Sequence, residues 1–233
     1  GGSVPLDLAF SDERGNAVRL RDEIDRPVIL TLVYFECEHI CPQVLGGLAE
    51  ALGKIDLTPR KDYKVFTLSF DDADTPETAM RARSNYVEAV GKSFPDGAWK
   101  FLTGDHESIK RITSDLGFTF RKEAHGFIHP VVLVILSPEG KITRYISVAK
   151  YQYGVAYRVT FSPIELAASI REASQGRIGV SSTRSDLFCF PEEPKEQAAF
   201  FRLLGIVGTV TLLGMVGLFV YLRRSTKKTH KER

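Results

Sequence analysis

The chain has 233 residues, of which 43% are hydrophobic and 26% are charged, and its formal net charge is +2. This is ordinary globular composition with room for one sizeable core, and three cysteines are too few for a disulfide scaffold. Residues 223–233 carry a net charge of +5, which leaves −3 for the rest of the chain. The basic character therefore belongs to the tail, and we expect no nucleic-acid binding.

Hydrophobic runs and turn residues predict strands that alternate with helices in the first half of the chain. An almost unbroken apolar run in residues 27–34 favours a central strand that is covered on both faces. In chain order we predict a hairpin in 4–20, the central strand in 27–34, a helix in 42–54, a strand in 64–70, a helix in 76–90, a strand in 99–103 and a helix in 105–117. The helix at 76–90 has Asp74 or Thr75 as its N-cap and Pro76 at its first position.

The second half of the domain is predicted to close the sheet with an antiparallel pair. We expect a short edge strand in 118–121, an apolar strand in 131–136, a turn in 137–140, an antiparallel strand in 141–148 and a helix in 162–174. Together these elements indicate an α/β fold, a thioredoxin-like sandwich in residues 1–174. A juxtamembrane linker is expected in residues 175–199.

A single transmembrane helix is predicted near the C-terminus, in residues 200–222. Residues 203–222 contain no charge, and 20 helical residues extend about 30 Å, the thickness of a bilayer core. The basic tail in 223–233 favours a cytoplasmic C-terminus, with the globular domain on the other side of the membrane. We expect a signal peptide to have preceded Gly1, and the domain to occupy an oxidising compartment.

The stretch from Tyr34 to Pro42 contains two cysteines between the central strand and the next helix. Three residues separate Cys37 from Cys41, one more than in the common dithiol spacing. The helix N-terminus stabilises a thiolate, and this wider loop can close to a disulfide or hold a soft metal between two sulfurs. A purely structural disulfide is the alternative.

Four histidines lie in the globular domain. His106 stands at a helix start and His39 lies between the cysteines, and we expect both on the surface. His125 and His129 belong to the loop before the apolar strand, which faces the cysteine turn in a thioredoxin-like fold. This position favours His129 over His125 as a functional residue.

Two thiolates and one imidazole form a soft site with few ligands. Such a site suits Cu(I), and with an added oxygen ligand it can hold Cu(II). Zinc usually requires a fourth strong ligand. We therefore predict a copper site formed by Cys37, Cys41 and His129.

Four sequence features, in this order, resemble the SCO/SenC family of copper chaperones. They are Tyr34-Phe35-x-Cys37-x-x-x-Cys41-Pro42, then Asp74-Thr75-Pro76, then Phe101-Leu102-Thr103-Gly104, and His129 nine residues before Pro138. The resemblance covers roughly residues 5–189. The segment 172–179 and the later Cys189-Phe190 also resemble a bacterial branch of this family.

The resemblance implies a protein anchored in the bacterial inner membrane, with its globular domain in the periplasm and its C-terminus in the cytoplasm. Cys37, Cys41 and His129 would bind one copper ion and pass it to the CuA centre of a cytochrome oxidase subunit. The chain departs from the family pattern at Glu38, where proline is common, and at Ile128, where aspartate is common. Its anchor is C-terminal rather than N-terminal. The missing aspartate removes a residue that would orient the imidazole.

Two functional hypotheses remain open at this point, and the metallochaperone is favoured over an enzyme. The alternative is a thiol-disulfide oxidoreductase that reduces an apo copper protein, with Cys37 as nucleophile and Cys41 as resolving thiol. In thioredoxins a cis-proline faces the dithiol, and His129-Pro130 occupies that place, although a cis bond is not expected. Because copper binding requires reduced cysteines, a thioredoxin-like reductant is a further expected partner. Cys189 is interpreted as a buried or lipid-adjacent residue, with an intermolecular disulfide or a transient copper contact as alternatives.

Overall fold

The computed structural model describes residues 2–91, 94–123, 126–147, 149–153 and 156–181, and the five residues 209, 211, 212, 214 and 215. The chain divides into two compact units, Gly1–Cys189 and Phe190–Arg233. All five described residues of the second unit are helical. The fold below is therefore that of the first unit.

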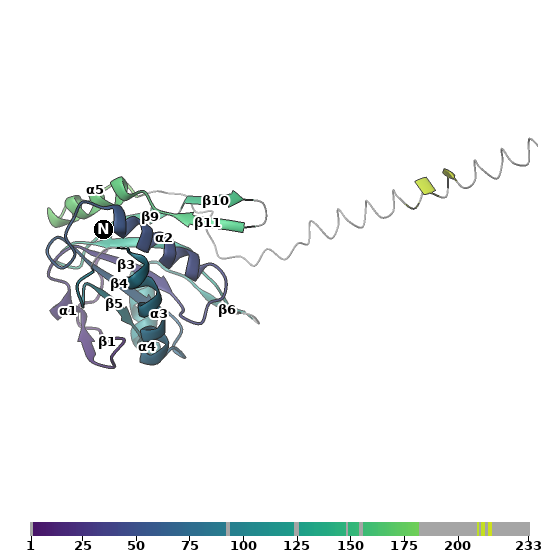
Figure 1. Ribbon diagram of the computed structural model, residues 1–233. Helices are drawn as coiled ribbons and strands as arrows, with labels where there is room; N and C mark the ends of the chain where they lie inside the picture. The colour runs from purple at the N-terminus through teal and green to yellow at the C-terminus, as the bar shows by residue number, and fades with distance from the viewer. Residues whose placement is uncertain are drawn as a thin grey trace, which may run out of the picture. The chain divides into compact units, whose positions relative to one another are not determined.

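In the described part of the first unit, strands and helices alternate between residues 20 and 115, and six strands then precede the last helix (Figure 1). They are β1 (Ala9–Ser11), β2 (Ala17–Arg19), α1 (Leu20–Glu23), β3 (Val28–Val33), α2 (Cys41–Lys54), β4 (Lys64–Ser69), α3 (Pro76–Ala89), β5 (Trp99–Leu102), α4 (His106–Asp115), β6 (Arg121–Glu123), β7 (Gly126–Ile128), β8 (Val132–Leu136), β9 (Ile142–Ser147), β10 (Ala149–Tyr153), β11 (Ala156–Thr160) and α5 (Pro163–Ser174).

A mixed sheet of β5-β4-β3-β8-β9 forms the centre of the described domain. β3 pairs in parallel with β4 and antiparallel with β8, so it has a partner on both sides. All six residues of β3 are buried. Each fully buried Val, Leu or Ile side chain contributes about 1.5–3 kcal/mol relative to exposure. The central strand predicted from its apolar run is confirmed, and the loop after its last residue, Val33, starts from a fixed position.

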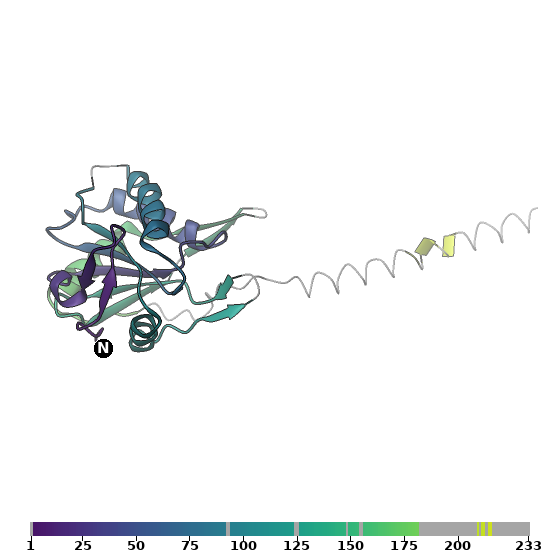
Figure 2. The same cartoon turned by 90° about the horizontal axis from the view of Figure 1, so that it is seen from below.

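Helices cover both faces of this sheet, as expected for a thioredoxin-like sandwich. α2 and α3 connect the parallel strands β3, β4 and β5, and Figure 2 shows α4 on the opposite face of the sheet from α3. The N-cap of α3 is Thr75, whose hydroxyl accepts a hydrogen bond from the Thr78 N–H. α5 begins after the N-cap Ser162, as predicted.

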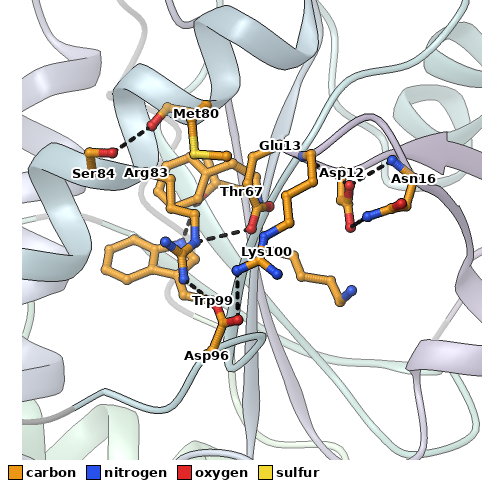
Figure 3. A network of polar contacts seen from close by, with 12 residues as sticks. Asp12, Glu13, Asn16, Thr67, Met80, Arg83, Ser84, Asp96, Trp99 and Lys100 are labelled. Carbon is orange, nitrogen blue, oxygen red and sulfur yellow. Dashed lines mark hydrogen bonds and ion pairs between the residues drawn. The ribbon is translucent and has the colours of Figure 1, made fainter.

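A buried ion pair attaches α3 to the N-terminal hairpin and β5. The Arg83 Nε lies 3.0 Å from the Glu13 carboxylate, and the Glu13 side chain is only 4% exposed. The second Glu13 oxygen accepts a hydrogen bond from the Phe101 N–H, and Arg83 also donates to Asp96. Figure 3 shows Arg83 between Glu13 and Asp96, with Trp99 beside it. These contacts fix α3, the helix that borders the cysteine loop.

Two expectations about the second half of the domain need correction. Residues 118–120 form no strand, because Phe118 and Phe120 turn their rings onto Phe70 at 5.4 and 4.8 Å instead of pairing at an edge. The strand begins only at Arg121, and β6 pairs with β7 outside the main sheet. A second separate hairpin, β10–β11, was not predicted, although its residues alternate in character on either side of 154–155.

The predicted transmembrane segment falls almost entirely outside the described residues. Of residues 200–222, only the five described helical residues can be compared with the prediction. No helix in the described part of the chain is long and apolar enough to cross a bilayer. The membrane span therefore stays a prediction, as do the limits of the linker and of the cytoplasmic tail.

Candidate metal centre

The two cysteines lie where the central strand meets α2. The loop after β3 brings Cys37 back toward the strand end, where its N–H bonds the Tyr34 carbonyl at 3.3 Å. α2 then begins at Cys41, with Pro42 in its first turn. Both cysteines are buried, at 6% and 2% exposure, and both are free thiols. The structural disulfide considered from the sequence is absent.

Asp74 holds the first residues of this loop in place. Its buried carboxylate accepts hydrogen bonds from the Phe35 N–H at 2.7 Å, the Ser69 hydroxyl at 2.5 Å and the Thr78 hydroxyl at 3.1 Å. The sequence indicated Asp74 only as one candidate N-cap of α3. The structure gives the cap to Thr75 and directs the Asp74 side chain back to the loop that carries Cys37.

The Cys37 sulfur is surrounded by hydrogen-bond donors. The Cys41 side chain makes the largest contribution, and the Tyr34 hydroxyl and the backbone N–H groups of Cys41 and His39 also donate to it. These bonds outweigh burial and lower the pKa of Cys37 from 9.0 to about 5. At neutral pH Cys37 is therefore a thiolate, the form that binds metals and attacks disulfides.

His129 directly follows the β6–β7 hairpin and lies next to Cys41. Its Nδ1 lies 2.9 Å from the Pro130 carbonyl oxygen, which can only accept, so Nδ1 carries the proton. Nε2 therefore has the free lone pair, and it lies 3.9 Å from the Cys41 sulfur. The Pro130 carbonyl thus orients the imidazole, the role for which Ile128 offers no side-chain acceptor.

Aromatic rings enclose the His129 imidazole. The ring centroids of Phe70, Phe118 and Tyr34 lie 4.8, 6.0 and 6.2 Å from it, and the residue is 1% exposed. Burial lowers the pKa of His129, and this outweighs the hydrogen bond to Pro130 and the charge of Cys37. The imidazole is thus neutral at physiological pH and available as a ligand.

The three predicted ligands form two neighbouring pairs. The Cys37 sulfur accepts a hydrogen bond from the Cys41 thiol, and the Cys41 sulfur lies next to the His129 ring. Among the residues that the structure describes, no group of three or more His, Cys, Asp or Glu side chains is arranged to hold a metal ion. Binding by all three residues would therefore bring the donor atoms closer together than they lie here.

The other candidate residues lie apart from this centre or outside the described chain. His39 is exposed, and His106 pairs with Asp72 on the surface at 3.0 Å, as expected for both histidines. His125 and Cys189 lie outside the described residues. The described peptide bonds, including His129–Pro130, contain no cis bond.

Two tyrosines without a predicted role, Tyr34 and Tyr86, lie close to the cysteines. Tyr34 donates to Cys37 and packs edge-on against His129, so it connects the two sides of the centre. Gly126 in β7 approaches this hydroxyl so closely that a Cβ would lie 2.6 Å from it. Tyr86 on α3 is near enough for the charges of Cys41 and Cys37 to contribute, after burial, to its raised pKa. The position of Tyr34, directly after a strand and three residues before Cys37, could have indicated that its hydroxyl lies near the cysteines.

Comparisons with known proteins place this chain in a family. The family model described as SCO1/SenC matches residues 5–160, and no curated protein matches. A putative electron transfer protein from Aquifex aeolicus VF5 is 30% identical, with a TM-score of 0.64 over 76% of this chain and 95% of that protein. Copper-bound ScoI from Arabidopsis thaliana is 19% identical, with a TM-score of 0.56 over 75% and 98% of the two chains. BsSco, described as a member of the Sco family of cytochrome c oxidase assembly proteins, is 21% identical, with a TM-score of 0.58 over 75% and 95%. The chain therefore belongs to the SCO1/SenC family.

Proposed function

We propose that this protein binds one copper ion with Cys37, Cys41 and His129 and delivers it to a cytochrome oxidase. The observation that carries this proposal is the position of His129, whose free Nε2 is held 3.9 Å from the Cys41 sulfur. A histidine with only a packing role has no need of a fixed tautomer that directs its lone pair at a thiol.

The donor set fits copper by its chemistry. Two sulfurs and one neutral imidazole nitrogen are ligands that Cu(I) prefers, and the low pKa of Cys37 supplies one thiolate without loss of a proton at neutral pH. Here copper is cargo, so the site must release it as well as bind it. The neighbouring Glu36, Glu38 and His39 are exposed, which supports approach by a partner protein.

The family relatives support the identity of the cargo and of the acceptor. ScoI from Arabidopsis thaliana was solved with copper bound, and BsSco belongs to a group of cytochrome c oxidase assembly proteins. We infer that the acceptor is the oxidase subunit that bears the CuA centre. We also propose that residues 200–222 anchor the protein in the bacterial inner membrane, with the copper domain in the periplasm and the tail of 223–233 in the cytoplasm.

A second candidate function is thiol-disulfide exchange, favoured by the low pKa of Cys37 beside a second free thiol. The Cys37 thiolate would attack a partner's disulfide and release one partner thiolate. The Cys41 thiolate would then attack the mixed disulfide, release the second partner thiolate and leave a Cys37–Cys41 disulfide. Two electrons pass to the partner, and a thioredoxin-like reductant would restore the dithiol.

Anaerobic Cu(I) titration of the reduced full-length protein against a chromophoric chelator tests the copper proposal. We expect one tight equivalent in the wild type. His129→Ala should weaken it by more than the roughly 10–100-fold that loss of a residue supporting a ligand costs. The matched control is His106→Ala, since His106 is exposed and pairs with Asp72. Equal affinity in wild type and His129→Ala would contradict the proposal and leave thiol-disulfide exchange as the leading function.

A further inference from the structure

A cavity opens onto both cysteines on the side of α3. It has a volume of about 230 Å³, and its lining includes Cys37, Cys41, Leu45 and Ala82. His129 does not line this cavity, so its contact with Cys41 lies outside it. Cys41 therefore contacts the histidine on one side. On another side, both cysteines border a space between the cysteine loop and α3 that is large enough for a small side chain.

An exposed ion pair lies at the rim of this cavity. Arg81 on α3 lies 2.8 Å from Glu36, the residue directly before Cys37, and both residues line the cavity. Their side chains are 68% and 66% exposed. Exposed pairs of this kind contribute at most about 1 kcal/mol, so an incoming anion can compete with Glu36 for the guanidinium.

The charge of the site explains why a cation at the rim matters. Copper(I) bound by two thiolates carries a net negative charge, and the ligand best suited to remove it is a third thiolate, which is also negative. The positive charge of the Arg81 guanidinium offsets the repulsion between the negatively charged site and an incoming thiolate that approaches along α3. Asn85, one turn further along α3, also lines the cavity and is exposed, so the rim continues along the helix.

We propose that this cavity is the docking site for a cysteine side chain of a partner polypeptide, guided by Arg81 to the sulfurs of Cys37 and Cys41. For the copper step the proposal rests on the function proposed above. The incoming thiol loses its proton and its sulfur forms a bond to Cu(I), while one bond from Cu(I) to a protein sulfur breaks and that sulfur takes up a proton. No electron is transferred. The rim from Thr78 to Asn85 covers eight residues of helix with a rise of about 10 Å, which suits a polypeptide better than a free thiol.

Access to the sulfurs can be measured without copper. The reduced, metal-free full-length protein is mixed with a hexapeptide whose single cysteine forms a disulfide with thionitrobenzoate. The Cys37 thiolate attacks the disulfide and releases the coloured thionitrobenzoate anion. We expect Arg81→Gln to slow this reaction about tenfold at low salt, and less at high salt, because the cation no longer attracts the anionic probe. Ala82→Leu should slow it similarly because the added carbons fill the cavity.

Two controls separate docking from other effects. Arg111→Gln removes an exposed arginine of α4 that pairs with Asp7, and it should leave the rate unchanged. Alkylation by neutral iodoacetamide should proceed equally in wild type and Arg81→Gln, which excludes a change in thiolate reactivity. Asn85→Ala should slow the peptide probe but not the same disulfide of free cysteine, and equal slowing of both would contradict a polypeptide partner.

Equal peptide rates in wild type, Arg81→Gln and Ala82→Leu would overturn the docking site. Cu(I) affinity, measured in parallel, should be the same in these three proteins. Failure of the wild type to bind Cu(I) would contradict the proposed function but not the docking of a cysteine, because the peptide assay contains no metal. The two proposals can thus fail separately.

Discussion

Cys37 is the residue whose chemistry the fold changes most directly. Donation from the Cys41 side chain, Tyr34 and two backbone N–H groups lowers its pKa to about 5. Because this value lies below the ordinary 9.0, the stabilisation of the thiolate is complete above about pH 9 and is lost as the pH falls toward 5. Cys37 should therefore contribute less to the free energy of unfolding of the reduced protein at pH 5 than at pH 9.

The low pKa of Cys37 predicts fast alkylation in mildly acidic solution. In the reduced protein, the iodoacetamide reaction assigned to Cys37 by peptide mass spectrometry should have its midpoint near pH 5. Tyr34→Phe removes one donor to the sulfur and should move the midpoint upward. A wild-type midpoint near pH 9 would contradict the hydrogen-bond pattern around Cys37.

Asp74 is the residue on which the position of the cysteine loop depends. Asp74→Ala leaves the Phe35 N–H without its acceptor, and an unsatisfied buried donor costs about 1–3 kcal/mol. We expect a lower thermal midpoint and weaker Cu(I) binding, because the loop that carries Cys37 loses its support. Asp105→Ala removes an exposed N-cap of α4 and should lower stability by about 1 kcal/mol without affecting copper. Unchanged copper affinity in Asp74→Ala would show that the loop does not need this contact.

Among the elements, α3 contributes both to the cysteine site and to the stability of the fold. It lines the cavity with Arg81 and Ala82 on one side, and it is held by Arg83 on the other. Sequence periodicity predicted this helix and its proline start, because both are local properties. The ion pair between Arg83 and Glu13 joins residues 70 positions apart, so no local pattern indicated it.

Loss of this buried ion pair should destabilise the protein markedly. Arg83→Met leaves the Glu13 carboxylate buried without its cation, and removal of one partner from such a pair costs about 3 kcal/mol or more. Arg111→Met removes an exposed partner and should cost less than about 1 kcal/mol. Chemical denaturation of both variants measures the difference. Equal stabilities would show that the Glu13–Arg83 contact does not hold α3.

The two hairpins show where element prediction from sequence failed. Residues 118–120 have the composition of a strand. The packing of Phe118 and Phe120 on Phe70, however, is a contact between residues far apart in the chain, which the local sequence does not indicate. The same packing builds the shell around His129. The sequence thus predicted that His129 lies near the cysteine loop, but not the rings that bury it or the Pro130 carbonyl that sets its tautomer.

For the molecule as a whole, the order of elements from β3 to α4 was predictable, because apolar runs and helix caps are properties of short stretches of sequence. The site followed from topology, since the loop before β8 meets the loop after β3 in this kind of sheet. Contacts between residues far apart in the chain, such as the Asp74 carboxylate with the Phe35 N–H, leave no local pattern in the sequence.

The proposed membrane anchor gives a prediction for the whole chain. Expressed in bacteria, the full-length protein should stay in the membrane pellet after alkaline carbonate extraction, because the uncharged residues 203–222 match a bilayer core. A version that ends before residue 200 should appear in the soluble fraction. Release of the full-length protein by carbonate would contradict a transmembrane anchor.

X-ray absorption at the copper edge of the Cu(I)-loaded, reduced protein determines which atoms bind the ion. We expect two sulfurs and one nitrogen bound to copper in the wild type, and loss of the nitrogen in His129→Ala. The same set of ligands in both proteins, or a wild-type shell without two sulfurs, would contradict a copper centre formed by Cys37, Cys41 and His129.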